Sequence, residues 1–529
     1  MNISILHIFL YNQKSGSERF MLTIDFSRRG AKSFTECIYE DLKDRIGRGA
    51  ILADEKLPSK RALADHLGVS VITVQNAYEQ LIAEGYVYSR EKKGYFATPL
   101  ESDSMHSGEP LPRQQSEARL PHAAPQGAQG AAKNAPQGAQ GAAKNAPQGA
   151  QGARFSEARR AGDSVDLRSN STSSEKFPFT LWAKLLRAVL NGPQERLLQP
   201  IPPQGLEELR GAIAEYVERF RNMSVSADQI VIGAGTEYLY GLIVQLLGRG
   251  KTYAVENPGY TKTAAILSAN GAACVPVGMD DAGITEENLL STRADVAHVS
   301  PAHHFPTGIV MPVKRRQELL VWAARGGHYI IEDDYDSEFR FTGRPIATLQ
   351  SADSGGRVIY MNTFSKTLAP SFRISYMILP KQLSRRFQTE FGFYSCTVSS
   401  FEQLALAQFI RQGFYEKHLI RMKNYYRNLR NDLISALERS ALRPLMEIQE
   451  KNAGLHFLLK IDTDKTDAQL KTQAERNGLA VSFLSDYLYA GTAPDFPADG
   501  TRTLVVNYSG IRKEQIPQII ARLNKAVAG

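Results

Sequence analysis

Four segments of the C-terminal half combine residue types that can hold a phosphate and react with a carbonyl compound. Each segment follows a short apolar run, and the four are 233–238, 258–260, 332–335 and 363–366. Ligands of open α/β sheets bind beyond the carboxyl ends of the strands. We therefore expect these segments, which are far apart in the sequence, to meet around one pocket.

The residue types in these segments suit pyridoxal 5'-phosphate (PLP). Lys366 is the expected catalytic residue, because a lysine is needed to form a Schiff base with this cofactor. Asp333 can hold the ring nitrogen protonated, so that the ring acts as an electron sink. Tyr335 can bond the ring hydroxyl, and Tyr260 can stack on the ring.

The phosphate of such a cofactor needs several hydrogen-bond donors. A helix beginning at Gly235 and Thr236 would present free backbone N–H groups and a positive dipole end. Thr363, Ser365 and Arg373 can complete the phosphate cup, Arg373 by a bidentate pair. Each residue alone is more often a surface or packing residue, so the prediction depends on their order and clustering.

A second group of polar residues lies in the N-terminal part, on helices with helix-turn-helix spacing. Two basic residues open the second helix and suit backbone phosphates, a serine caps the third helix, and polar side chains of that helix suit base edges or phosphates. Lysines of a following hairpin turn add charge. The expected DNA-binding residues are Lys60, Arg61, Ser70, Thr73, Gln75, Asn76, Lys92 and Lys93. The alternative is a small winged domain used for protein contact.

The elements that carry these residues follow from hydrophobic spacing. In the N-terminal part, helices are expected at 33–47, from 58 and from 70, followed by two short strands at 86–90 and 95–97. Their inward residues are Phe34, Ile38, Leu42, Ile46, Leu63, Ala64, Leu67, Val74, Ala77, Tyr78, Leu81 and Ile82.

The C-terminal part alternates apolar runs with helical stretches, which predicts an α/β domain with a mainly parallel sheet. The runs are 231–232, 253–255, 296–299, 329–331, 358–361 and 376–379. From about Asn424 a long helix, strands at 455–461 and 503–506 and a helix at 467–477 predict a smaller α+β domain.

The chain of 529 residues is too long for one domain, and its composition divides it into four parts. Residues 1–20 read as an extension before a true start at Met21, and 21–98 as a winged helix-turn-helix domain. Residues 99–164 contain an eleven-residue repeat from Ala124 with almost no aromatic side chain, which predicts a disordered tether. Residues 165–529 form the cofactor-binding part.

Composition excludes several other classes of protein. An apolar content of 43% and a charged content of 22% exclude a fibre or a wholly disordered chain. The three cysteines cannot form a disulfide framework or a C-x-x-C metal clip, so we expect no metal site and a cytoplasmic protein. No run approaches the ~20 apolar residues of a membrane span. The net charge of +8 is thinly spread, so DNA binding depends on local arrangement.

The segment 57–86, LPSKRALADHLGVSVITVQNAYEQLIAEGY, closely resembles the winged helix-turn-helix of GntR-type transcription regulators. The resemblance covers about 33–98 and includes the cap, the turn and the core spacing together. These domains often carry a basic residue just after the turn serine, whereas this chain has Val71. Base readout is therefore expected to depend more on Thr73, Gln75 and Asn76.

The segments 301–308, 332–339 and 363–376 look like those of fold-type I aminotransferases, over about 165–529. With the winged domain in front, the chain is identified as a member of the MocR-type subfamily. The resemblance implies Lys366 as the lysine bound to PLP, with Asp333 at the ring nitrogen, Tyr335 at the ring oxygen and Arg373 at the phosphate. It also implies a homodimer, often domain-swapped.

Two departures separate the chain from catalytic aminotransferases. Phe305 stands where they usually place an asparagine, and Val505 stands where the arginine for the substrate α-carboxylate is expected. Lys262 and Arg502 are the candidate substitutes for binding an effector. Arg502 lies three residues early, about 10 Å away along an extended strand.

We therefore expect a regulator that binds a double-stranded DNA operator and senses PLP or an amino compound as its small-molecule effector. The missing arginine favours PLP itself, or an amine without an α-carboxylate. The alternative is an active aminotransferase with an appended DNA-binding domain, although Val505 and Phe305 count against efficient turnover. A scaffold that binds no DNA is a third possibility.

Overall fold

The structure is a computed structural model, and it describes residues 22, 24, 26, 32–90, 93–99, 164–169, 172–173, 176–341, 346–449, 453–489 and 501–528. The expected extension at 1–20 lies outside the described residues. So do Lys92 and the expected tether, apart from the end residues 99 and 164.

The N-terminal domain has three helices and a hairpin. The elements are α1 (Phe34–Gly47), α2 (Lys60–Leu67), α3 (Val71–Ala83), β1 (Val87–Arg90) and β2 (Gly94–Ala97). Ser33, Ser59 and Ser70 cap the three helices, because each side chain accepts a hydrogen bond from a first-turn N–H. Gly68 ends α2 at a φ of 66°, which the tight turn to α3 requires.

The expected apolar faces pack into one core in this domain, with one exception. Phe34 is 40% exposed, so its inward placement was wrong. It is the first residue of α1, and its ring packs edge-on against Phe26 instead of entering the core of the three helices.

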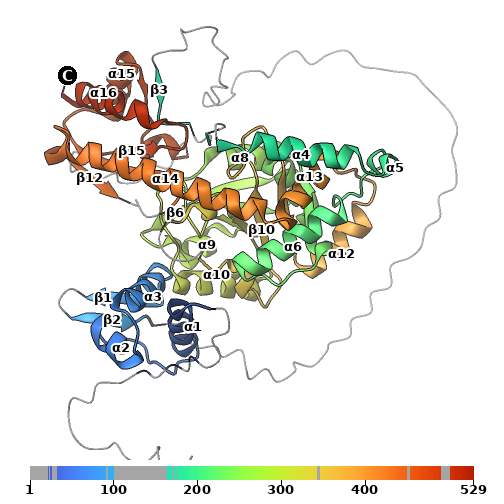
Figure 1. Ribbon diagram of the computed structural model, residues 1–529, viewed down its shortest axis with the longest axis horizontal. Helices are drawn as coiled ribbons and strands as arrows, with labels where there is room; N and C mark the ends of the chain where they lie inside the picture. Colours follow the sequence, from blue (N-terminus) through green and yellow to red (C-terminus); the bar gives the residue numbers. More distant parts are fainter. Residues whose placement is uncertain are drawn as a thin grey trace, which may run out of the picture. The chain divides into compact units, whose positions relative to one another are not determined.

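An eight-stranded sheet forms the centre of the C-terminal part (Figure 1). Its strands are β4 (Ile230–Gly233), β5 (Thr252–Asn257), β6 (Ala273–Asp280), β7 (Gly283–Ile284), β8 (Val296–Val299), β9 (Tyr329–Asp333), β10 (Val358–Thr363) and β11 (Ser375–Ile378). The strand order is β4-β11-β10-β9-β8-β5-β6-β7, and the sheet is parallel except at β11 and β7. The six expected strands and the mainly parallel sheet are thus confirmed.

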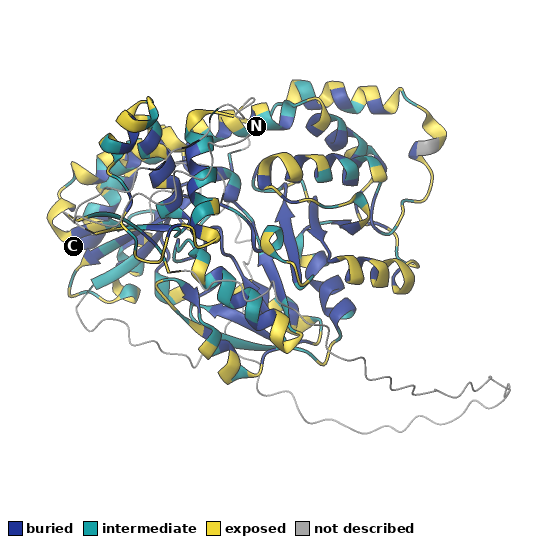
Figure 2. Ribbon diagram, turned by 90° about the horizontal axis from the view of Figure 1, so that it is seen from below, coloured by how far each residue is buried: buried dark blue, intermediate teal, exposed yellow. Residues whose placement is uncertain are grey.

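Alternate residues of these strands pack into different helical layers. Ile230, Ile232 and Tyr360 pack with α4 (Phe179–Leu190), α6 (Glu207–Arg221) and α13 (Ser400–Arg411). Val231 and Ile359 pack with α7 (Thr236–Leu247), α8 (Thr261–Ala269) and α12 (Lys381–Glu390). Further along, α9 (Glu286–Thr292) and α10 (Val313–Gly326) cover the strands. Figure 2 shows the strands buried between helices whose outer faces are exposed.

The smaller α+β domain is confirmed, with one shifted boundary. A three-stranded sheet of β12 (Met446–Gln449), β13 (His456–Asp462) and β15 (Thr501–Asn507) packs against α14 (Phe414–Glu438), α15 (Asp467–Arg476) and α16 (Ile516–Ala528). The long helix α14 begins at Phe414, ten residues before the expected start at Asn424, because Gly413 in a left-handed conformation separates it from α13.

The first residues after the linker belong to this smaller domain. β3 (Val165–Asp166) pairs in parallel with β14 (Leu479–Ala480). The N–H of Leu167 donates to the carbonyl of Ala480 at 2.9 Å, and the N–H of Asn507 donates to the carbonyl of Leu167 at 3.0 Å. The segment 165–167 is thereby hydrogen-bonded to both β14 and β15, which lie more than 300 positions later in the chain.

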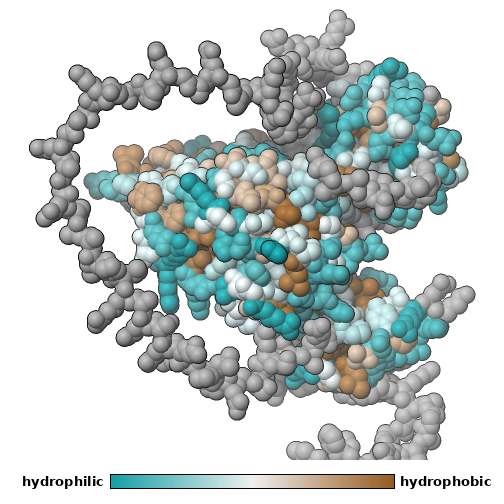
Figure 3. All heavy atoms as spheres, turned by 180° about the vertical axis from the view of Figure 1, so that it is seen from behind, coloured by the Kyte–Doolittle hydropathy of each residue, from teal (hydrophilic) through white to brown (hydrophobic). Residues whose placement is uncertain are grey.

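Among the described residues, no helix combines the length and the apolar character that crossing a bilayer requires. Figure 3 shows a face on which hydrophilic residues dominate and hydrophobic residues are scattered among them.

Candidate functional site

The expected loops meet around one cavity of about 510 Å³ in the C-terminal part. It lies where β9 ends at Asp333 and β10 ends at Thr363. Of the residues expected to bind the cofactor or an effector, the cavity is lined by Thr236, Tyr260, Lys262, Asp333, Tyr335, Thr363, Ser365, Lys366 and Arg373. The remaining two are Gly235, which lies against Arg373, and Arg502, which is not part of the lining.

Lys366 is a half-buried residue whose amine has carboxylates nearby. Burial lowers its pKa to about 8, although the charges of Asp336 and Asp333 act in the opposite direction. At neutral pH a larger share of the amine is therefore unprotonated than for an exposed lysine. An unprotonated amine is the form that attacks a carbonyl carbon.

Asp333 is held by two residues that the sequence analysis did not identify. The Tyr240 hydroxyl donates to Asp333 Oδ2 at 3.0 Å and lies 2.7 Å from His298 Nε2. His298 Nε2 is itself 3.7 Å from Asp333 Oδ2. These contacts fix the carboxylate at the end of β9, facing the cavity. A carboxylate held in this way can bond a protonated ring nitrogen.

The start of α7 carries two of the residues expected to form a phosphate cup. Gly235 is the N-cap, at a φ of 91°, and the next residue Thr236 begins the helix. A Cβ at Gly235 would overlap the guanidinium of Arg373, so only glycine lets Arg373 lie against this helix start. Free first-turn N–H groups beside a guanidinium suit a phosphate.

Two hydroxyls complete this side of the cavity. Thr363 Oγ1 accepts from the N–H of Ser365 at 3.2 Å and from the hydroxyl of Ser375 at 2.8 Å. The Ser365 hydroxyl donates to the carbonyl of Phe372 at 2.6 Å. These bonds tie the loop of Lys366 to residues on both sides of Arg373.

The lining of the cavity includes residues that the sequence analysis missed. They are Arg168, Glu256, Tyr487 and Tyr489. Phe305, with its ring centroid 6.0 Å from that of Tyr260 and 5.0 Å from that of Tyr487, links two sides of this lining. Glu256 is the penultimate residue of β5 and lies two residues before the segment 258–260, so its position near the end of a strand was the available signal.

Glu256 is a buried acid beside a buried histidine. Burial raises the pKa of Glu256 to about 8, and its Oε2 accepts from the N–H of Ser300 at 3.0 Å. His304 Nε2 lies 3.5 Å from the same oxygen, and burial lowers the pKa of His304 to about 3. Both groups are therefore mainly neutral at pH 7.

The two candidate effector residues differ in placement. Lys262 lines the cavity and forms an ion pair with Glu237, whose pKa its hydrogen bond lowers. Arg502 was expected to bind an effector, but it lies outside the cavity lining. Its Nε donates to the carbonyl of Lys465 at 2.8 Å and lies 3.8 Å from Asp467. Val505 is 2% exposed and pairs with Leu458 inside the small sheet, so it lines no part of the cavity.

The expected DNA-binding residues lie on α2, on α3 and at the hairpin. Arg61, Ser70, Asn76 and Lys93 are exposed, and Lys60, Thr73 and Gln75 are half-buried. The Ser70 hydroxyl is occupied as the α3 cap, and Gln75 Nε2 donates to Glu79 Oε1 at 2.8 Å. Asn76 is thus the most accessible amide of α3.

Ile72 is an exposed residue of α3 that the sequence analysis passed over. Its side chain is 68% exposed. It lies two positions before Val74 and five before Ala77, off the buried face, so helical spacing alone identifies it. An apolar side chain there can contact a thymine methyl group in the major groove.

Comparisons with known proteins match both parts of the chain. The family of aminotransferases class I and II matches residues 163–523, and the gntR family of bacterial regulatory proteins matches 34–96. The HTH-type transcriptional regulator YdeL of Bacillus subtilis (strain 168) is 34% identical over 92% of this chain and 96% of its own. MocR of Rhizobium meliloti, a probable rhizopine catabolism regulatory protein, is 31% identical over 92% of each chain.

The fold of the C-terminal part also matches solved structures. The kynurenine aminotransferase of Pyrococcus horikoshii is similar with a TM-score of 0.60 and 22% identity, over 70% of this chain and 91% of that protein. This similarity concerns the fold, which is the fold expected from the sequence.

Proposed function

Because this chain belongs to the MocR-type regulators of the GntR family, which join a helix-turn-helix domain to an aminotransferase-like domain, we propose that it senses PLP or an amino compound in the cavity around Lys366. The observation that carries the proposal is the meeting of Lys366, Asp333, Tyr335 and Arg373 in one cavity. The regulator relatives cover almost the whole chain, whereas the aminotransferase structure covers its C-terminal part only.

The residues of the cavity fit PLP. The helix start at Gly235 and Thr236, with Arg373 against it, would hold the phosphate. Asp333 would hold a proton at the ring nitrogen, and Tyr335 would bond the ring oxygen. When bound, PLP would supply an aldehyde for amines and a ring that accepts electrons. Lys366, with its lowered pKa, would offer the amine that holds PLP through its aldehyde.

The same cavity favours sensing over turnover. Neither residue considered for binding a substrate carboxylate lies in the cavity, because Val505 is an uncharged residue buried in the small sheet and Arg502 is engaged with Lys465 and Asp467. We therefore propose PLP itself, or an amine without an α-carboxylate, as the effector. Effector binding would bias the DNA-binding domains by contacts that differ between two conformations.

We further propose that the protein acts in the cytoplasm as a homodimer, with its winged domains exchanged between subunits, on a double-stranded operator. The resemblance to MocR-type regulators supports this assembly. Light scattering of the purified full chain would measure a mass near twice 58.6 kDa. A monomer at the concentrations that bind DNA would contradict the dimer.

A gel-shift titration with DNA from upstream of its own gene, with and without PLP, tests the function. We expect salt-sensitive binding whose affinity PLP changes in the wild type and not in Lys366→Ala. If PLP-loaded and PLP-free protein bind the DNA with the same affinity, PLP is not the effector.

The complete set of Lys366, Asp333, Tyr335 and Arg373 favours one second candidate, an active aminotransferase. Steady-state assays with amino donors and keto acids decide between the two. Turnover of about 1 s⁻¹ or faster, an ordinary enzyme rate, would favour the enzyme. We expect turnover far below that rate.

A further inference from the structure

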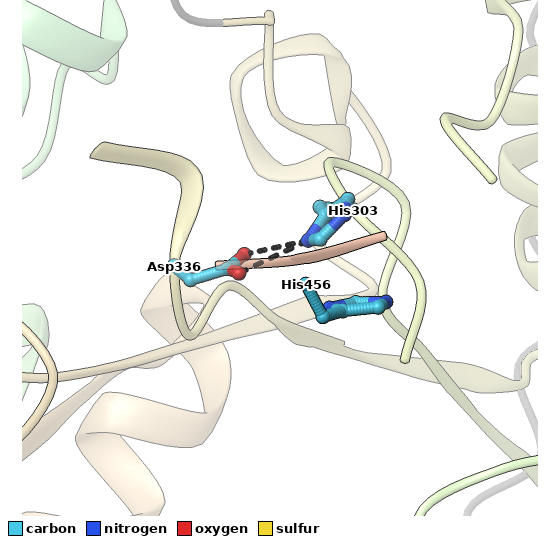
Figure 4. A group of neighbouring side chains, drawn as sticks. All are labelled: His303, Asp336 and His456. Atoms are coloured by element: carbon cyan, nitrogen blue, oxygen red, sulfur yellow. Dashed lines mark hydrogen bonds and ion pairs between the residues drawn. The ribbon is translucent and has the colours of Figure 1, made fainter. Parts of the chain in front are cut away.

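A buried cluster beside the cavity contains His303, which has no place in the cofactor site described above. His303, Asp336 and His456 come from three separate segments and are each at most 3% exposed. Figure 4 shows the Asp336 carboxylate pointing at the His303 ring, with the His456 ring beside it. The charge of Asp336 also acts on Lys366, so the cluster lies close to the reactive amine.

The contacts of His303 determine which of its nitrogens carries the proton. His303 Nδ1 lies 3.1 and 3.0 Å from the two carboxylate oxygens of Asp336. A carboxylate accepts hydrogen bonds and cannot donate them, so Nδ1 is protonated and donates to Asp336.

The Tyr335 hydroxyl oxygen lies 3.2 Å from the same nitrogen. A protonated Nδ1 cannot accept a hydrogen bond, so the Tyr335 oxygen faces it with a lone pair. The hydroxyl hydrogen must then point away from His303. Tyr335 lines the cavity, and a hydrogen directed there is available to an acceptor on a ligand.

The surroundings of His303 hold its ring in this orientation. Gly454 has a φ of 68°, and a Cβ there would overlap the His303 ring. The His456 ring lies 4.6 Å from that of His303, centroid to centroid, and His456 Nε2 donates to the carbonyl of Pro306 at 3.1 Å. His303 Nε2 is buried without a hydrogen-bond partner among the described residues, so no second bond competes for the ring.

We infer that His303 is a positioning residue that directs the Tyr335 hydroxyl hydrogen into the cavity, where the ring oxygen of PLP would accept it. Asp336 sets the proton of His303, and Gly454 leaves the space for its ring. The inference rests on the proposed function, because the acceptor belongs to PLP.

The same cluster also has the ligand types of a divalent-metal site. Two histidines and a carboxylate offer atoms within 4.8 Å of one another. However, the Lys366 ammonium lies close enough to Asp336 and His456 to act on the pKa values of Lys366 and His456, and it would repel a dication. We therefore favour the positioning role and make metal binding an outcome of the test.

A double-mutant cycle on PLP binding to the full chain tests the inference. Equilibrium dialysis measures the dissociation constant of PLP for wild type, His303→Leu, Tyr335→Phe and the double variant. We expect His303→Leu to weaken binding roughly tenfold in the wild-type background and less than about twofold in the Tyr335→Phe background, because His303 acts through that hydroxyl. The exposed His66→Leu serves as the control and should not change binding.

His303→Asn keeps an N–H donor near the position of Nδ1, so it should recover most of the affinity lost in His303→Leu. It also keeps the test decisive if His303→Leu fails to fold. Equal losses in both backgrounds, or a failed recovery by a folded His303→Asn, would overturn the positioning role. One equivalent of zinc per chain in wild type, absent from His303→Asn, would overturn it in favour of a metal site. If wild type itself binds no PLP, the proposed function fails instead.

Discussion

Lys366 makes folding of the cofactor-free protein depend on pH in a way that an exposed lysine would not. Its folded-state pKa of about 8 lies below the ordinary value of 10.5, so the unfolded chain binds the proton more tightly. The difference amounts to about 3 kcal/mol against folding below pH 8, and it disappears as pH rises to 10.5.

Lys366→Met should therefore raise the free energy of unfolding of the cofactor-free protein by about 2–3 kcal/mol at pH 7. The gain should shrink towards pH 10. Urea denaturation at several pH values, followed by tyrosine and tryptophan fluorescence, measures it. The exposed Lys381→Met provides a matched control. A gain that is independent of pH would show that packing, and not the proton, is responsible.

Glu256 should show the opposite dependence, because burial raises the pKa of this acid from 4.5 to about 8. The folded state then binds the proton more tightly, so the destabilisation is absent below pH 4.5 and complete above pH 8. Glu256→Gln keeps an acceptor for the Ser300 N–H and cannot ionise. We expect it to stabilise the protein by up to a few kcal/mol at pH 8 and not at pH 4.5. Thermal unfolding of wild type and Glu256→Gln at pH 4.5 and pH 8 measures the gain. The same gain at both pH values would show that ionisation of Glu256 is not responsible.

Among the elements, the start of α7 depends on one glycine. Gly235→Ala places a Cβ against Arg373 and forces an alanine to a φ of 91°, which costs about 1–3 kcal/mol. We expect PLP affinity to fall at least roughly tenfold, because Arg373 must move. Gly250→Ala has open space around its Cβ and is the control. Fluorescence titration with PLP measures both, and equal affinities would rule out a phosphate at this helix start.

The α2 and α3 helices should contribute to DNA binding in different ways. Arg61→Ala, at a phosphate position, should weaken binding to all sequences and reduce the salt slope by about one. Asn76→Ala, on α3, should instead reduce discrimination between operator and unrelated DNA, by about 1–3 kcal/mol. Fluorescence anisotropy at several salt concentrations separates the two effects. Arg48→Ala, at the C-cap of α1, should leave both quantities unchanged. If Asn76→Ala also leaves them unchanged, the placement of α3 is wrong.

The strands that were predicted from the sequence are those whose side chains are buried on both faces of the sheet. The strands β4, β8 and β10 are buried throughout and read as apolar runs. The strand β6 was missed, because it is only partly buried and contains Pro276 and Gly278. Such a sequence resembles a loop, and only pairing with β5 makes it a strand.

The site shows the same limit. Lys366 and Asp333 were identifiable because their segments follow buried strands and contain a recognisable order of residues. Arg168, Tyr487 and Tyr489 reach the cavity from the smaller domain and its N-terminal strand. No local pattern marks them, since only the tertiary fold brings them to the cavity. The ion pair between Lys262 and Glu237 likewise joins separate helices.

At the scale of the whole molecule, binding of PLP and binding of DNA must be reciprocal. If PLP changes the affinity for the operator by some factor, the operator must change the affinity for PLP by the same factor. We expect a factor between about 5 and 150, the usual range of such coupling. Titration calorimetry of PLP with and without saturating operator, compared with anisotropy of DNA with and without PLP, gives both factors. Unequal factors would reveal a third linked equilibrium, such as a change in assembly.

The pairing of β3 with β14 determines which part of the protein would feel tension along the linker. The bonds from Val165 to Gly478, from Leu167 to Ala480 and from Asn507 to Leu167 anchor the chain just after residue 164. Tension along the linker would therefore act first on the edge of the smaller domain, and only afterwards on the strand that precedes Lys366. Arg168 and Ser169 follow directly in the sequence and line the cavity, so the same tension would act on them next.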